Sequence, residues 1–160
     1  MRPSTPKTLP LKMRALDLFA GTHSFTRVAQ QAGYEVTSVD ISPKHSPTIV
    51  ANVLDWDYKQ YPRGHWDFIW CSPPCTLLSI APAHLFTAEQ REERAGASLA
   101  VVEKMVEILD WFNPRWYCIE TPNSSALWRQ PIMQGLPTVV VSYCMYGFPY
   151  RKKTKLATNI

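Results

Sequence analysis

Short apolar runs alternate with polar stretches along most of the chain. These runs predict seven β-strands, because a strand buried in a parallel sheet is apolar on both faces rather than at every second residue. The predicted strands are residues 14–20, 34–41, 47–57, 65–72, 115–120, 136–146 and 154–160. Strands that alternate with helices indicate an α/β fold whose sheet is mostly parallel and covered on both faces.

Two stretches have the spacing of helices. Residues 22–33 begin with hydroxyl side chains and end at a glycine, as helices often do. In residues 87–112 apolar side chains recur at steps of three and four. Between the last two predicted strands there is only the basic turn GFPYRKK, so we expect those strands to pair as an antiparallel hairpin.

The composition indicates one globular domain. The chain has 160 residues, 46% of them apolar, which is enough for a hydrophobic core. Residues 1–13 are rich in proline and basic side chains and are expected to form an N-terminal tail, which leaves residues 14–160 as the domain. The net charge of +4 is compatible with an anionic partner but does not by itself indicate one.

Two classes of protein fit the sequence poorly. No apolar run is long enough to span a membrane and none resembles a secretion signal, so we expect a cytoplasmic protein whose four cysteines stay reduced. The closest cysteines, Cys71 and Cys75, are separated by three residues that include two prolines. No metal site is therefore predicted, because zinc sites favour tighter pairs.

The first candidate site lies where the first three predicted strands end, since α/β sheets bind ligands beyond the carboxyl ends of their strands. Gly21 follows the first strand, and Asp40 ends the second strand 19 residues later. This spacing fits a carboxylate that accepts hydrogen bonds from a ribose, but the single glycine of GTHSFT argues against a dinucleotide. A nucleoside-bearing cofactor without phosphates fits better, with Asp55 and Trp56 placed to contact its adenine. An ordinary turn glycine and a helix-capping Asp40 are the alternatives.

The second candidate site contains Cys75 and Glu120. Two prolines before Cys75 fix the backbone and remove two donors, so the strand must end there. A rigidly placed thiolate can act as a nucleophile, and Glu120, at the end of the neighbouring strand, can stabilise a ring nitrogen. The plainer alternatives are a small buried cysteine and a carboxylate that caps a helix or forms a salt bridge.

Four motifs in one order resemble a known family. LDLFAG (16–21), PPC (73–75), IE (119–120) and YGFPYRKKTK (146–155) are similar to motifs of the cytosine-C5 DNA methyltransferases, and most of all to the compact forms in phages and large viruses. The resemblance covers residues 14–159. It implies a Rossmann-like, S-adenosylmethionine-dependent methyltransferase fold, a mostly parallel sheet with an antiparallel C-terminal hairpin, and DNA as the partner.

The resemblance also implies roles for individual residues. Cys75 would add to C6 of cytosine, and Glu120 would hydrogen-bond N3. Within the cofactor site, Phe19 would pack on the adenine, Asp40 would hold the ribose and Asp55 would contact the adenine amino group. The full set expected to bind S-adenosylmethionine is Phe19, Ala20, Gly21, Thr22, Asp40, Ile41, Asp55 and Trp56. The set expected to contact nucleic acid is Arg151, Lys152 and Lys153.

The chain departs from the family pattern in several places. His23 replaces a common glycine, Thr76 a glutamine and Thr121 an asparagine, and the Gln-x-Arg-x-Arg element appears as Tyr150, Lys152 and Thr154. No target-recognition domain is recognisable, nor a C-terminal helix that returns to the cofactor site. The chain would then be a minimal enzyme, a fragment, or a protein that needs a partner subunit.

Two other functions remain open. The element SPP (72–74) is also similar to a motif of methyltransferases that modify the exocyclic amine of N4-cytosine or N6-adenine, although Cys75 and Glu120 argue against that chemistry. Alternatively, the fold serves a non-catalytic nucleic-acid-binding module, with the basic turn at 151–155 as its contact surface. The plainer interpretation of this turn is that it is only the solvated tip of a hairpin. Cys75 and Glu120 favour an enzyme, because a binding module needs neither.

Overall fold

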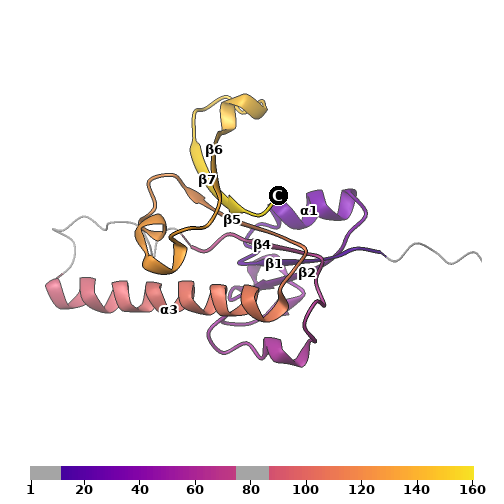
Figure 1. Cartoon of the computed structure of the whole chain (residues 1–160), viewed down its shortest axis with the longest axis horizontal. Coiled ribbons are helices and arrows are strands. Elements are labelled where there is room, and N and C mark those ends of the chain that lie inside the picture. The colour runs from indigo at the N-terminus through magenta and orange to yellow at the C-terminus, as the bar shows by residue number, and fades with distance from the viewer. Residues whose placement is uncertain (1–11, 75–86) are drawn as a thin grey trace, which may run out of the picture.

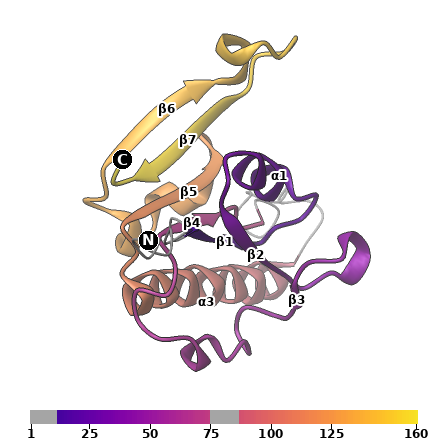
Figure 2. The same ribbon diagram turned by 90° about the vertical axis from the view of Figure 1, so that its right-hand side faces the viewer.

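Seven strands form a single sheet in the part of the chain that the computed structural model describes, residues 12–74 and 87–160. They are β1 (Arg14–Leu18), β2 (Glu35–Asp40), β3 (Ile49–Val50), β4 (Phe68–Cys71), β5 (Trp116–Pro122), β6 (Thr138–Ser142) and β7 (Lys153–Thr158). Their order across the sheet is β3-β2-β1-β4-β5-β7-β6 (Figure 1 and Figure 2). This order reverses between β1 and β4, and such a switch point is where α/β sheets bind ligands.

The directions of the strands follow the connections between them. The five strands β3, β2, β1, β4 and β5 run parallel to one another. Strand β7 is antiparallel to both β5 and β6. A parallel pair needs a crossover, but β6 and β7 are joined by a short turn and can only run in opposite directions. The predicted mostly parallel sheet and its antiparallel C-terminal hairpin are both confirmed.

The third strand is very short, and it lies within the stretch 47–57 where the sequence predicts a short strand. We expected a strand within residues 47–57, but only Ile49 and Val50 pair with β2. Trp56 and Tyr58 are buried in the core from a turn and from the 3-10 helix η2 (Tyr58–Gln60). Their large apolar side chains produced a strand-like pattern in a segment that contributes to the core without extended pairing.

Helix α3 (Ala88–Phe112) covers one face of the sheet (Figure 1). It begins with a capping box, in which the Thr87 hydroxyl accepts a hydrogen bond from Gln90 N and the Gln90 side chain accepts one from Thr87 N. Its buried side chains form one core cluster with those of β1, β4 and β5: Val102, Met105, Ile108, Leu109 and Phe112. Neither α3 nor any other helix within residues 12–74 and 87–160 is apolar enough over sufficient length to cross a membrane.

Helix α1 (Ser24–Gln31) lies on the opposite face (Figure 1). Asp17, buried in the middle of β1, accepts hydrogen bonds from the backbone N–H and the hydroxyl of Thr26, at 3.2 and 2.6 Å. Phe25 stacks on Trp70 of β4, with ring centroids 5.1 Å apart and planes 6° apart. These contacts fix the start of α1 above the carboxyl ends of β1 and β4.

The C-terminal hairpin extends away from the rest of the molecule as an arm (Figure 1 and Figure 2). Its tip, residues 143–152, consists of the 3-10 helix η6 (Tyr143–Tyr146) and the turn that follows it. Tyr143 N donates to Lys152 O at 3.0 Å and closes the tip, and Gly147 provides the turn with a left-handed residue at φ 85°. Strand β7 pairs with β5 from Thr158 to Thr154, and Thr154 lies opposite Pro122 at the carboxyl end of β5. The tip of the arm therefore begins beside that end of β5.

Candidate active site

The loop after β1 has an unusual backbone. Phe19 has a φ of 61°, a left-handed conformation that is costly for a residue with a bulky side chain, and Gly21 follows with a φ of 47°. Ala20 N donates to Val39 O at 3.1 Å, which ties the loop to β2. The loop therefore turns sharply at the switch point and presents the Phe19 ring to the space beyond the strands.

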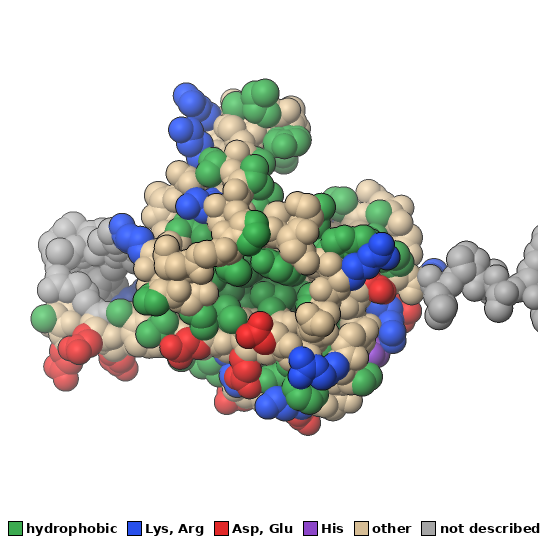
Figure 3. Space-filling view, viewed as in Figure 1, with side chains coloured by type: hydrophobic (Ala, Val, Ile, Leu, Met, Phe, Trp, Pro, Cys, Tyr) green, Lys and Arg blue, Asp and Glu red, His purple; other side chains and the backbone are tan. Residues whose placement is uncertain are grey.

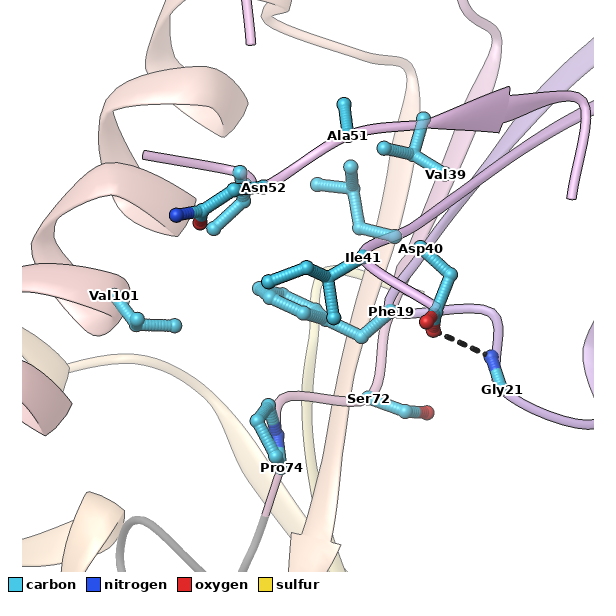
Figure 4. A pocket seen from close by; sticks show the side chains of 12 residues that line it. Phe19, Gly21, Val39, Asp40, Ile41, Ala51, Asn52, Ser72, Pro74 and Val101 are labelled. Atoms are coloured by element: carbon cyan, nitrogen blue, oxygen red, sulfur yellow. Dashed lines mark hydrogen bonds between the residues drawn. The ribbon is translucent and has the colours of Figure 1, made fainter. Parts of the chain in front are cut away.

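Asp40, at the end of β2, holds this loop in place. Its Oδ2 accepts a hydrogen bond from Gly21 N at 2.8 Å (Figure 4). Its Oδ1 accepts one from Ser42 N, also at 2.8 Å. The N-cap residue of the next 3-10 helix is Ser42, so Asp40 is not the capping residue. Each Asp40 oxygen keeps a free lone pair, because a carboxylate oxygen can accept more than one hydrogen bond.

His23 adds a second link between the same two loops. It lies at the N-cap of α1 with a left-handed φ of 60°, where the sequence departs from a glycine. Its Nε2 donates to His45 O at 2.8 Å. The side chain thus connects the loop after β1 to the loop after β2, a contact that a glycine at this position could not make.

A cavity of about 380 Å³ opens beside Asp40 (Figure 4). Most of its wall is apolar, with Asp40, Asn52 and Ser72 as the polar side chains. The lining residues are Leu18, Phe19, Gly21, Val39, Asp40, Ile41, Ala51, Asn52, Val53, Ser72, Pro74 and Val101. We call it the first cavity. It contains four of the residues predicted to bind the cofactor, namely Phe19, Gly21, Asp40 and Ile41.

The other four predicted cofactor residues lie outside the first cavity. Ala20 and Thr22 line the second cavity, which is described below. Asp55 is exposed and Trp56 is buried in the core, where its ring lies 6.1 Å from that of Tyr58. Neither belongs to the lining of the first cavity, to which Asn52 and Val53 contribute instead. The early end of β3 determines which side chains of this loop face the cavity, and the predicted roles of Asp55 and Trp56 at a cofactor stay predictions.

A second cavity, of about 700 Å³, lies on the α1 side of the sheet. Glu120 of β5 faces it, and the Tyr143 hydroxyl donates a long hydrogen bond of 3.5 Å to Glu120 Oε1. The wall is completed by side chains from β1, α1, β4 and the arm. The lining residues are Asp17, Phe19, Ala20, Gly21, Thr22, Ser24, Phe25, Val28, Trp70, Ser72, Glu120, Val141, Tyr143, Thr154 and Leu156.

The two cavities adjoin. Phe19, Gly21 and Ser72 line both of them. Ser72 is fixed from two sides, since its N–H donates to Leu18 O at 3.2 Å and its hydroxyl accepts from Trp70 Nε1 at 2.7 Å. Asp40 and Glu120 therefore face separate spaces that meet at the end of β1 and β4.

Asp17 is a buried carboxylate in the second cavity to which the sequence pattern assigns no role. It is 2% exposed, and burial raises the pKa of its carboxyl, an effect that the hydrogen bonds from Thr26 oppose. The signal in the sequence that could have indicated Asp17 is a carboxylate inside an otherwise apolar strand. Its hydrogen bonds with Thr26 give Asp17 a structural role, because they anchor α1 to the sheet.

Cys75 lies outside the described residues, so its predicted role stays a prediction. The described chain reaches Pro74, which lines the first cavity, and Pro73 is buried. The three basic residues are at the end of the arm: Arg151 and Lys153 are exposed, and Lys152 Nζ lies 4.7 Å from the centre of the Tyr143 ring. The structure places these cations apart from the first cavity, on the side of the second.

Known proteins resemble this chain in sequence and in fold. A probable DNA (cytosine-5)-methyltransferase of Frog virus 3 is 31% identical over 157 residues, which cover 92% of this chain and 71% of that protein. No family model matches. The Dnmt2 methyltransferase of S. pombe has a TM-score of 0.58 at 13% identity, covering 91% of this chain and 50% of that one. A tRNA (uracil-54, C5)-methyltransferase of Pyrococcus abyssi has a TM-score of 0.54 at 15% identity, covering 91% and 34%.

The strand order, together with the solved structures, makes this a Rossmann-like α/β fold of the S-adenosylmethionine-dependent methyltransferases. Within that class, the chain belongs to the DNA (cytosine-5)-methyltransferase family. It spans half of the S. pombe structure and about a third of the Pyrococcus abyssi structure, so those likenesses concern the fold alone.

Proposed function

We propose that the protein transfers a methyl group from S-adenosylmethionine to C5 of cytosine in DNA. The observation that carries this proposal is the contact between the two cavities, since direct transfer requires donor and acceptor to meet. Asp40 faces one cavity and Glu120 the other, and Phe19 lines both. The name of the Frog virus 3 relative, a probable DNA (cytosine-5)-methyltransferase, supports the choice of acceptor.

The first cavity suits the cofactor. Its volume of about 380 Å³ falls in the range of small-molecule sites, roughly 300–1,000 Å³. The free lone pairs of Asp40 can accept hydrogen bonds from the two ribose hydroxyls, and the Phe19 ring and Val53 can pack on the adenine. When bound, S-adenosylmethionine supplies an electrophilic methyl group. In this proposal Asn52 takes the place next to the adenine that the sequence had suggested for Asp55.

The second cavity suits a cytosine base. C5 of cytosine is a weak nucleophile, and addition of the Cys75 thiolate to C6 makes C5 enamine-like and able to accept a methyl group. Glu120 hydrogen-bonds N3 and stabilises the charge that develops on the ring. Loss of the C5 proton to a base then expels the thiolate and restores the aromatic ring. The role of Cys75 comes from the sequence motif, and the place of Glu120 in the cavity supports it.

The basic residues of the arm would hold the nucleic acid. Arg151, Lys152 and Lys153 lie on the same hairpin that lines the second cavity through Val141 and Tyr143. Contacts from these cations to phosphates would position the strand without reading its sequence. We place the reaction in the cytoplasm of an infected cell, where thiols such as that of Cys75 stay reduced.

The product of the reaction tests this proposal. Purified protein is incubated with methyl-labelled S-adenosylmethionine and cytosine-containing DNA, and the nucleosides are identified by mass spectrometry. We expect 5-methylcytosine, and we expect Glu120→Gln to lower the rate by about 10²–10³, as for loss of one stabilising group elsewhere. Glu103→Gln, on the exposed side of α3, is the control and should keep the rate.

Other products would favour the other functions. N4-methylcytosine or N6-methyladenine would contradict C5 transfer and support the exocyclic-amine reaction. A protein that binds DNA and the cofactor product but transfers no methyl group to any DNA tested would support the binding module instead.

A further inference from the structure

The tip of the arm exposes several large apolar side chains close together. Met145, Tyr146, Phe148 and Tyr150 are 79, 68, 48 and 51% exposed. Figure 3 shows hydrophobic side chains gathered at the top of the arm, with Lys and Arg side chains along its edge. Contiguous apolar surface of this kind is uncommon on soluble proteins and marks interaction sites. We call these four residues, with Arg151 and Lys153, the tip surface.

The rings at the tip form a preformed cluster. The centroid of Phe148 lies 5.2 Å from that of Tyr143 and 5.7 Å from that of Tyr150. Phe148 N donates to Tyr143 O at 3.3 Å, so the backbone of the turn holds the rings together. Little conformational freedom remains to be lost when a flat ligand stacks on Phe148 or Tyr150.

The charge of this part of the chain determines which ligand fits. Residues 121–160 contain no aspartate or glutamate, but they contain five lysines and arginines: Arg129, Arg151, Lys152, Lys153 and Lys155. The whole chain has a net charge of only +4. The excess positive charge of the protein is therefore confined to the arm and the segment leading into it, which makes the tip surface complementary to a polyanion.

Exposed rings beside cations have the chemistry of single-strand binding. Unpaired bases stack on aromatic side chains whatever their sequence, while basic residues follow the phosphates. In a duplex the bases stack on one another, so the same rings gain no partner. A protein that presents only cations would not distinguish the two forms in this way.

The arm also connects the tip to the second cavity. Val141, at the end of β6, and Tyr143, the first residue of the tip, line that cavity together with Glu120. A strand held on the tip would thus lie next to the place where the base is modified. A base that is already unpaired avoids the cost of being flipped out of a duplex, which is a few kcal/mol.

We propose that the tip surface is a binding site for single-stranded nucleic acid, with unpaired bases stacked on Phe148 and Tyr150 and phosphates bound by Arg151 and Lys153. Resting on the proposed function, this inference makes unpaired cytosine the preferred substrate. The arm then has two parts: its base completes the cavity for the reacting base, and its tip captures neighbouring bases of the same strand.

The test measures binding of a labelled single-stranded 20-mer containing one cytosine, and of the same sequence as a duplex, by fluorescence anisotropy at several salt concentrations. We expect the wild-type protein to bind the single strand at least about fivefold more tightly than the duplex. The double variant Phe148→Ala/Tyr150→Ala should bind the single strand at least about fivefold more weakly, with duplex affinity and salt dependence unchanged. Arg151→Ala/Lys153→Ala should reduce the slope of log affinity against log salt by about 0.7 per contact.

Two further variants make the test specific for base stacking. Phe148→Leu/Tyr150→Leu keeps the apolar bulk but removes the rings, so it should be as defective as the alanine pair. Val140→Ala removes an apolar side chain on the same hairpin that is 49% exposed, and it should bind like the wild type. Thermal unfolding of every variant checks that it is folded under the conditions of the binding assay.

Several results would overturn the inference. Equal loss of single-strand and duplex affinity in the alanine pair would remove the strand preference, and unchanged affinity for both would remove the rings from the site. Full binding by the leucine pair would show that apolar bulk, and not the stacking of bases on rings, holds the strand. If binding of phosphatidylserine vesicles is measured as well, a loss confined to the vesicles in the alanine pair would assign the tip to a membrane. Binding and methylation separate the two proposals: C5 methylation without single-strand preference contradicts only this inference, whereas single-strand binding without methylation contradicts only the proposed reaction.

Discussion

Asp40 shows how much a single side chain contributes to the first cavity. Its two oxygens accept the N–H groups of Gly21 and Ser42, so one carboxylate fixes the loops after β1 and β2 at the same time. The same oxygens remain available to a ribose. Loss of this side chain should therefore affect both the shape of the cavity and the binding of its ligand.

We predict that Asp40→Ala weakens S-adenosylmethionine binding by about 1.5–3 kcal/mol, roughly 10- to 150-fold in the dissociation constant, because hydrogen bonds to a charged group are lost. Isothermal titration calorimetry measures this directly. Asp57→Ala is the matched control: Asp57 is exposed and its side chain makes no capping hydrogen bond. Equal affinity of the Asp40→Ala variant and the wild type would exclude Asp40 from the site.

The residues of the first cavity were more predictable than those of the second. Gly21 and Asp40 lie at the ends of two strands that the apolar pattern identifies, and the topology of α/β sheets brings such ends together. Tyr143 and Thr154 face Glu120 only because β7 pairs antiparallel with β5 in a register that sets Pro122 opposite Thr154. No local pattern encodes that register. Asp55 lies outside the lining of the first cavity for a related reason, since the end of β3 depends on pairing with β2.

At the scale of elements, α3 is attached to the loop after β3 through Glu107. This carboxylate accepts hydrogen bonds from Lys104 and from the Tyr58 hydroxyl of η2, and Lys59 Nζ lies 3.6 Å away. The hydrogen bond from Lys104, followed by that from Tyr58, lowers the pKa of Glu107 to about 2. Burial, followed by the hydrogen bond to Glu107, raises the pKa of Tyr58 to about 12.

These shifts predict how stability depends on pH. A carboxyl whose pKa is lowered by folding contributes stability above its ordinary pKa of 4.5, and the contribution is lost as the pH falls toward about 2. We expect Glu107→Gln to be less stable than the wild type near neutral pH, and the difference to shrink as the pH falls below 4.5. Urea unfolding of both proteins at a series of pH values checks this. A difference that stays constant from pH 6 to pH 3 would contradict it.

The elements themselves were largely predictable because the sequence marks their ends. Thr87 and Gln90 form the capping box that begins α3, and the basic turn between the last two strands allows only a hairpin. The length of the arm was not predictable. Its projection depends on β7 pairing with β5 along one edge and with β6 along the other, which is a property of the assembled sheet.

At the scale of the whole molecule, the two cavities and the charged residues are distributed over two regions of the chain. The body of the sheet, from β3 to β4, forms the first cavity, while β5 and the arm provide Glu120 and the cationic surface. Acidic residues are confined to the first 120 positions. The charge pattern thus separates a nearly neutral region, which contains the first cavity, from a positive region that contains the arm.

The central claim is C5 transfer through a covalent bond to Cys75, and the most direct measurement uses DNA that contains 5-fluorocytosine. Fluorine at C5 cannot leave as a proton does, so methyl transfer should trap the protein on the DNA as an adduct that survives denaturing electrophoresis. We predict that the adduct forms with the wild type only when S-adenosylmethionine is present, that mass spectrometry locates it on Cys75, and that Cys75→Ser abolishes it. Methyl transfer to cytosine by Cys75→Ser, or by the wild type without an adduct on the fluorinated DNA, would contradict the account.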